Sequence, residues 1–147
     1  MTVALSGKEV AEKLKQQFPE SIIESTEANL LVKSDSLFEI ISFLKTSQDF
    51  DFNFLNNITA VDYYDYFEVV YHLTSMKHNH SLTVKARCYS RENPAVPSIV
   101  PLYRGADFQE REVYDLMGIT FKGHPNLKRI LLWEGFQGYP LRKDYLS

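Results

Sequence analysis

The chain has 147 residues, of which 44% are hydrophobic, and it carries a formal net charge of -3. A chain of this length forms one ordinary domain and buries roughly two-thirds of the surface that its unfolded form exposes. The small negative charge disfavours a nucleic-acid-binding domain, which usually has a clear basic excess. Because Cys88 is the one cysteine, this chain cannot by itself form a disulfide, a four-thiolate iron–sulfur cluster or a cysteine-rich zinc site.

The amino terminus lacks the basic region followed by roughly 7–15 apolar residues that marks a secretory signal. Charged residues interrupt every apolar run well before the roughly 20 residues that a membrane helix needs. We therefore expect the protein to stay in the cytoplasm and to reach a membrane only through a partner.

Two helices are predicted in the first third of the chain. Ser6 with Glu9, and Ser36 with Glu39, have the spacing of a capping box at a helix start. Apolar residues follow at helical spacing, which predicts that one face of each helix is buried. These residues are Val10, Ala11, Leu14 and Phe18 in the first helix, and Leu37, Ile40, Ile41 and Leu44 in the second.

Five strands are predicted, at residues 21–24, 29–33, 55–62, 67–75 and 81–89. The first two form a pair, and the last two pair across the polar turn 76–80. In the last run Leu82, Val84, Ala86 and Cys88 alternate with polar side chains, which is typical of a half-solvated antiparallel strand. Cys88 is interpreted as a buried small apolar residue.

The last third has a different character. Asp107 is placed to cap a helix of about ten residues with Glu110 at its third position, and Gly118 is placed to end it with a positive φ. From Ile119 onward no periodicity remains, yet the segment is rich in aromatic residues. Such a tail either folds back on its own domain or lies along another protein, and the absence of a second predicted core favours the partner.

We therefore predict a single α+β domain with a mixed or antiparallel sheet flanked by helices and an extended, irregular C-terminal tail. Residues 1–104 are expected to form the α+β core. Residues 105–147 are expected to form, within the same domain, a helix and a tail that docks on a partner and becomes ordered mainly on assembly.

Residues 110–132, EREVYDLMGITFKGHPNLKRILL, and 138–145, GYPLRKDY, closely resemble the signature of the C-type subunit of bacterial respiratory complex I, also called the 30-kilodalton subunit. The order of strands and helices upstream suits the α+β fold of that family. Three residues depart from the family pattern: Phe108 stands where tryptophan is expected, and Phe136 and Tyr139 replace tryptophan and histidine. Because the sequence ends soon after Tyr145, we expect neither a longer nor a fused form of the subunit.

The resemblance implies a non-catalytic structural subunit of the membrane-extrinsic arm of a proton-translocating NADH-quinone oxidoreductase. Its partners would be the large quinone-site subunit and the iron–sulfur subunits, on the cytoplasmic side of the cell membrane. It implies no catalytic, cofactor-binding or metal-binding residue on this chain. Iron–sulfur clusters, flavin and quinone are expected on the other subunits.

The predicted helix suggests how the partner is bound. Arg111 and Asp115 lie four residues apart on a charged face, and Val113 and Met117 lie on an apolar face that should point inward. Exposed ion pairs add little stability, so the charged face is interpreted as a template for a partner's charges, with a merely solvated face as the alternative. Acid–base catalysis is disfavoured because no nucleophile or base partner is visible. The predicted partner-binding residues are Glu110, Arg111, Glu112, Asp115, His124, Arg129, Arg142, Lys143, Asp144 and Tyr145.

Several histidines and tyrosines have both a structural and a functional interpretation. His78 and His80 have a chelating spacing, but a polar turn is more often solvated. His124 is expected to shape a turn with Gly123 through its ring nitrogens. The tyrosines at 63, 64 and 66 suit either a recognition patch or the edge of the core, and that choice stays open.

The basic excess of the tail predicts an acidic partner surface. Two other functions remain open at this point. One is the equivalent subunit of a related complex, a photosynthetic-type NDH-1 or a membrane-bound hydrogenase. The other is a free-standing protein that binds an acidic partner through its basic, aromatic tail.

Overall fold

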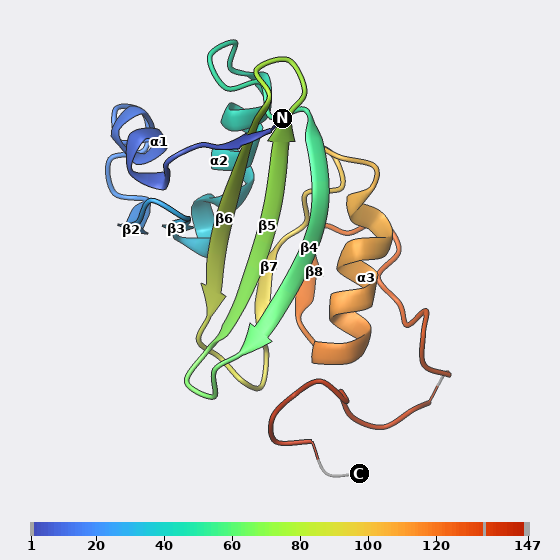
Figure 1. The fold of residues 1–147 in the computed structure, drawn as a ribbon. Helices are drawn as coiled ribbons and strands as arrows, with labels where there is room; N and C mark the ends of the chain where they lie inside the picture. Colours follow the sequence, from blue (N-terminus) through green and yellow to red (C-terminus); the bar gives the residue numbers. More distant parts are fainter. Residues whose placement is uncertain (1, 134, 146–147) are drawn as a thin grey trace.

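A computed structural model describes residues 2–133 and 135–145 (Figure 1). The helices are α1 (Gly7–Leu14), α2 (Leu37–Thr46) and α3 (Ala106–Met117), with a 3-10 turn η1 (Ser34–Ser36) before α2. The strands are β1 (Val3–Ala4), β2 (Ile22–Ser25), β3 (Leu30–Val32), β4 (Phe54–Asp62), β5 (Phe67–Ser75), β6 (His80–Cys88), β7 (Ala95–Pro97) and β8 (Thr120–Lys122). Among the described residues, no helix is long and apolar enough to cross a membrane.

The main sheet has the strand order β2-β3-β6-β5-β4, and β1 also pairs with β6. The long strands β4, β5 and β6 pair in antiparallel fashion, whereas β1 and β3 run parallel to β6. The sheet is therefore mixed. With the helices and an irregular carboxyl-terminal segment, it confirms the predicted α+β domain.

The hydrophobic core lies on one face of this sheet. On β5, Phe67, Val69, Tyr71 and Leu73 are fully buried, because alternate side chains of a strand point to one face. The predicted apolar stripe of α2 is also fully buried. Cys88 is buried as predicted, and burial raises the pKa of its thiol to about 11. In Figure 1, α2, β7 and β8 lie behind β4, β5 and β6, and no helix crosses in front of these three strands.

Both predicted capping boxes are wrong. Neither Ser6 nor Ser36 makes a side-chain cap at its helix. Ser36 has a helical backbone, with φ -100° and ψ 0°, and its hydroxyl is hydrogen-bonded to the hydroxyl of Ser21 at 2.7 Å. The first helix also ends at Leu14, so that Phe18 packs against the core from the following turn.

The segment after Ile119 contains a strand that periodicity did not reveal. Strand β8 pairs in parallel with β7, with Phe121 opposite Val96, and both side chains are buried. A three-residue strand is too short to carry a periodic signal. As β7 precedes α3 and β8 follows it, the pair fixes both ends of that helix.

Candidate partner-binding surface

Helix α3 places the predicted site residues. It begins at Ala106, so Asp107 lies inside the first turn and the prediction that it caps the helix is wrong. The helix ends at Gly118, whose φ of 75° confirms the predicted left-handed end. A Cβ at this position would lie 2.7 Å from the side chains of Tyr139 and Arg142. The glycine thus allows the last residues of the chain to pack against the helix end.

Glu110 is fully buried and does not belong to an exposed charged face. Its carboxylate accepts hydrogen bonds from the Ser98 hydroxyl at 2.7 Å and the Ile99 amide at 2.8 Å. Burial raises the pKa of this carboxyl above its usual range, while the two hydrogen bonds act in the opposite direction. Glu110 therefore joins α3 to the segment that follows β7.

Asp115, also fully buried, organises the segment between α3 and the end of the chain. Its Oδ2 atom accepts hydrogen bonds from three consecutive amides, those of Ile130 at 3.0 Å, Leu131 at 2.6 Å and Leu132 at 3.0 Å. The Nε atom of Arg129 lies 3.0 Å from Oδ1. One carboxylate thus fixes a turn of the tail, which we define as residues 123–145.

Two predicted partner-binding arginines are used inside the chain. Arg129 donates to the carbonyl oxygens of Phe136 and Gly138, and its guanidinium lies 4.8 Å from the centre of the Tyr139 ring. Arg142 donates from Nε to the carbonyl oxygen of Met117 at 2.7 Å and packs on the Tyr139 ring. The tail therefore packs on its own domain, although the sequence favoured a partner as its cover. Its ordering mainly on assembly stays a prediction, which hydrogen exchange on the isolated chain tests.

A second buried carboxylate ties the end of the tail to the sheet. Asp62, at the end of β4, receives two hydrogen bonds from Arg91 at 2.8 and 2.9 Å and one from the Lys143 amide at 2.9 Å. Arg91 also contacts Asp144 at 3.1 Å. The Arg91 guanidinium holds the pKa of Asp62 well below its usual range. Asp62 and Arg91 could not be predicted as site residues, because no local pattern links residues so far apart in the chain.

The remaining predicted residues differ in exposure. Arg111 is largely buried and pairs with Asp107 at 3.7 Å. Tyr145 is half-buried and stacks on the ring of Phe136. The predicted residues that are exposed are Glu112, Lys143 and Asp144.

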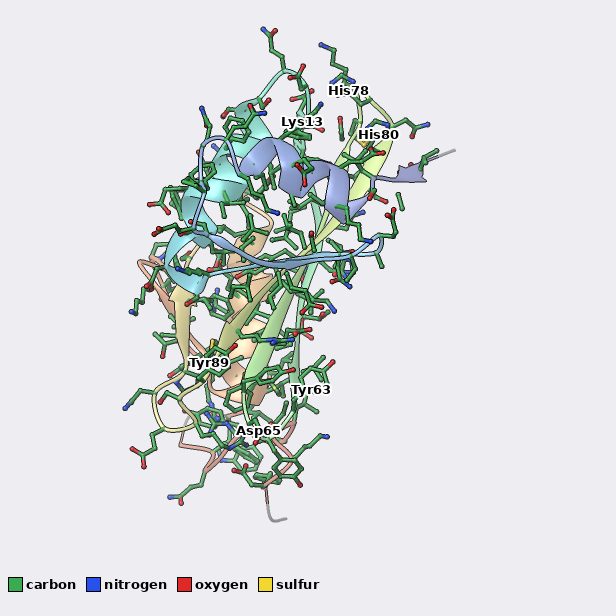
Figure 2. All side chains as sticks on the ribbon, turned by 90° about the vertical axis from the view of Figure 1, so that its left-hand side faces the viewer. Lys13, Tyr63, Asp65, His78, His80 and Tyr89 are labelled. Atoms are coloured by element: carbon green, nitrogen blue, oxygen red, sulfur yellow. The ribbon has the colours of Figure 1, made fainter. Side chains whose placement is uncertain are left out.

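His124 shapes a turn, as predicted. Its Nδ1 atom accepts the Asn126 amide at 2.9 Å, and its Nε2 atom lies 3.1 Å from Asp107 Oδ1. His78 and His80 lie at the opposite end of the sheet from Tyr63 and Tyr89 (Figure 2). In the described part of the chain no group of three or more His, Cys, Asp or Glu residues is placed to hold a metal ion.

Exposed apolar side chains gather on the tail. Leu131 is 58% exposed, Trp133 69% and Leu141 59%, although the backbone at or beside each of them is hydrogen-bonded to Asp115 or Leu116. At the lower end of the sheet in Figure 2, Tyr63 and Tyr89 are also exposed, and their rings contact the half-buried Tyr66. Large apolar groups held in water by a fixed backbone are typical of a protein–protein interface.

Comparisons with known proteins agree with this geometry. The family described as "Respiratory-chain NADH dehydrogenase, 30 Kd subunit" matches residues 30–147. The C-type subunit of the NADH-quinone oxidoreductase of Roseiflexus sp. (strain RS-1) is 39% identical over 97% of this chain and 85% of its own length. The corresponding protein of Dinoroseobacter shibae is 41% identical over 99% of this chain and 69% of its own length.

A solved structure shares the fold. A chain of the membrane-bound sulfane sulfur reductase, an archaeal respiratory membrane complex, aligns with a TM-score of 0.76 and 26% identity over 95% of this chain and 85% of that one. The chain therefore belongs to the family of the 30-kDa subunit of the respiratory-chain NADH dehydrogenase. It is a C-type subunit of the NADH-quinone oxidoreductase complex, which confirms the family suggested by residues 110–145.

Proposed function

We propose that the chain is a non-catalytic structural subunit of the membrane-extrinsic arm of a proton-translocating NADH-quinone oxidoreductase. It packs against the large quinone-site subunit and the iron–sulfur subunits and carries no redox centre. Iron–sulfur clusters, flavin and quinone then belong to those partners. Attachment to the cytoplasmic side of the membrane is indirect.

The observation that carries this proposal is the exposure of apolar side chains on a tail whose backbone is hydrogen-bonded to α3. Three hydrogen bonds to Asp115 fix the backbone at residues 130–132, yet Leu131 and Trp133 remain exposed. Ordering a flexible segment costs about 1–2 kcal/mol per residue, and a segment that is already ordered avoids most of this cost on binding. A preorganised apolar surface therefore suits a permanent interface between subunits.

The predicted site residues divide into two roles under this proposal. Buried Glu110, Asp115, Arg129 and Arg142 act indirectly, because they hold α3 and the tail in the binding conformation. Exposed side chains make the direct contacts. Those on the tail and its approach are Lys122, Lys128, Leu131, Trp133, Leu141 and Lys143. The exposed lysines favour an acidic partner surface.

Trp133→Ala tests the proposal in the assembled complex. Trp133 contacts Phe136 with ring centres 4.7 Å apart, and we expect the isolated variant to melt within a few degrees of the parent. Loss of an aromatic anchor typically weakens an interface by about 2 kcal/mol or more, which should clearly reduce the amount of intact complex on native gels. Quinone-reductase activity per assembled complex should remain normal.

Met76→Ala is the matched control. Met76 is 68% exposed in the turn between β5 and β6, far from the tail, and its loss should leave assembly unchanged. Normal assembly of the Trp133 variant would contradict the proposal. Full-sized complex with little activity per complex would instead assign Trp133 a part in catalysis.

A further inference from the structure

The two edges of the main sheet are built differently. Strand β2 at one edge has four residues, contains Glu24 and has a register shift between Ile22 and Glu24. Strand β4 at the other edge has nine residues, with neither a charge nor a proline before Asp62. Short strands, charges, prolines and bulges protect sheet edges from pairing with other chains. Strand β2 has such features over its whole length, whereas the irregularity of β4 lies near its start, between Leu55 and Asn57. Helix α3 covers part of the β4 edge, where Gln109 accepts from the Ile58 amide.

The free side of β4 offers backbone groups. In the described part of the chain β4 pairs with β5 alone. The Ile58 amide donates to the side chain of Gln109 on α3 at 3.4 Å, so it points away from β5. Backbone groups of a strand alternate in direction, and those of Ala60 therefore point to the same free side. Because Gln109 uses the Ile58 amide, a second extended chain would pair with the amide and the carbonyl of Ala60.

A groove lies between this edge and α3, which runs beside β4 at the margin of the sheet in Figure 1. Its volume is about 210 Å³, and its apolar lining includes Ala60, Val113, Leu116 and Leu141. Sites for small molecules usually measure about 300–1,000 Å³, so this groove suits a single apolar side chain instead. Glu112, which is exposed, is the charged residue of the lining.

We propose that β4 and α3 bind an extended segment of a partner subunit, which adds a strand to the free edge of the sheet. One apolar side chain of the segment occupies the groove, and a lysine or arginine of the segment faces Glu112. In this mode of recognition the added main-chain hydrogen bonds give affinity and the pocket gives specificity. The inference rests on the proposed role in a complex, but it concerns a surface that shares only Leu141 with the direct contacts assigned to the tail.

The charge of the occupant distinguishes the two surfaces. The tail exposes lysines and favours an acidic surface, whereas the lining of the groove carries one carboxylate and favours a basic segment. An acidic segment in the groove would leave Glu112 beside a like charge. A tail that prefers an acidic surface and a groove that prefers a basic segment together fix the orientation of the subunit better than either contact alone.

Thiol labelling tests the groove, measured on the fraction of each variant that assembles into the native membrane complex. The buried Cys88 gives little background, so Glu112→Cys, Glu39→Cys and Trp133→Cys each introduce one accessible thiol. Glu39 is the matched control, an exposed glutamate on α2. In the isolated chain all three thiols should react. In the complex the thiol at 112 should react at least about tenfold more slowly, as expected inside a packed interface, and the thiol at 39 should react as before.

The outcomes separate this inference from the proposed function. Unchanged reactivity at 112 with protection at 133 overturns the groove proposal and leaves the tail interface standing. Unchanged reactivity at both positions overturns both proposals. A dimer of the isolated chain with protection at 112 assigns the groove to a second copy, and this too overturns the proposal.

Ala60→Pro and Glu112→Lys test the added strand and the charge. Proline at an edge removes the amide that faces away from β5 and is tolerated where that amide is not used by the sheet. We expect intact complex to fall several-fold in both variants, and Glu39→Lys to assemble normally. Normal assembly of a folded Ala60→Pro chain would rule out the added strand. If Ala60→Pro does not fold, the charge variant decides. Assembly of Glu112→Lys to the same level as Glu39→Lys then overturns the proposal.

Discussion

The sheet core and the tail hold their shapes by different interactions. Strand β5 is buried along nearly its whole length, and its inward side chains pack against α2 and the neighbouring strands. The tail has little regular structure, and its backbone is fixed by two buried carboxylates, Asp115 and Asp62, and by two arginines, Arg129 and Arg142. Apolar packing spreads its stabilisation over many contacts, whereas the tail depends on a few charged groups.

This difference has a functional meaning. A segment without an apolar core of its own can expose large apolar side chains and still keep one conformation if charged hydrogen bonds fix its backbone. Leu131 and Trp133 are held in this way. The sheet provides the stability of the domain, and the tail provides a surface of fixed shape.

The largest expected effect follows from Asp115→Ala. The substitution leaves Arg129 without its carboxylate and three amides of residues 130–132 without their acceptor. Removal of one partner of a buried ion pair typically costs about 3–5 kcal/mol. Hydrogen exchange should show lost protection across residues 129–142 with β5 and β6 still protected. Equal loss in both regions would show that the tail and the core unfold as one unit.

Leu73→Ala should reduce protection from hydrogen exchange in the sheet core instead of in the tail alone. Leu73 is fully buried on β5, and such a truncation typically costs about 2–5 kcal/mol. The loss should appear in chemical denaturation of the whole domain, with β5, β6 and α2 all less protected. A variant in which only the tail loses protection would contradict the assignment of stability to the sheet.

The smallest effect concerns pH. Burial raises the pKa of Glu110 above its usual value of 4.5, so above that pH the folded protein holds a proton that the unfolded chain releases. Stability should therefore fall as pH rises from 4.5 through the folded pKa, and Glu110→Gln should reduce this slope. Asp62 has the opposite sign, because its contribution is complete above its usual value of 3.8 and is lost as pH falls below it. Denaturation at several pH values from about 5 to 7 measures this slope. The histidines also titrate between about pH 5 and 7, so the difference in slope between the parent and Glu110→Gln isolates Glu110. An identical slope in both proteins would exclude this role.

The regular helices and strands could be predicted because the spacing of their apolar residues matches the face that is buried. The alternation in residues 82–88 and the stripe of Leu37, Ile40, Ile41 and Leu44 correspond directly to buried faces. The end of α3 at Gly118 was also predictable, since a left-handed residue favours glycine. Family membership came from residues 110–145, whose pattern is long and specific.

The burial of the α3 charges could not be predicted from charge alone. Glu110 and Asp115 resemble a solvated face by residue type, but long-range partners at Ser98 and residues 130–132 satisfy their hydrogen bonds. One signal was present: Ala106, Glu110, Val113 and Met117 share helical spacing on the buried face. The hydrogen bonds of Arg142 to the carbonyl oxygens of Met117 and Arg91 could not be predicted for the same reason, because both residues lie far away in the chain.

The parallel pair of β7 and β8 has a mechanical consequence. It joins the strand before α3 to the strand after it, with Ala95 opposite Thr120 and Pro97 opposite Lys122. A pull on the tail by a moving neighbour would load this pair along the strands, so that its hydrogen bonds share the force instead of breaking one by one.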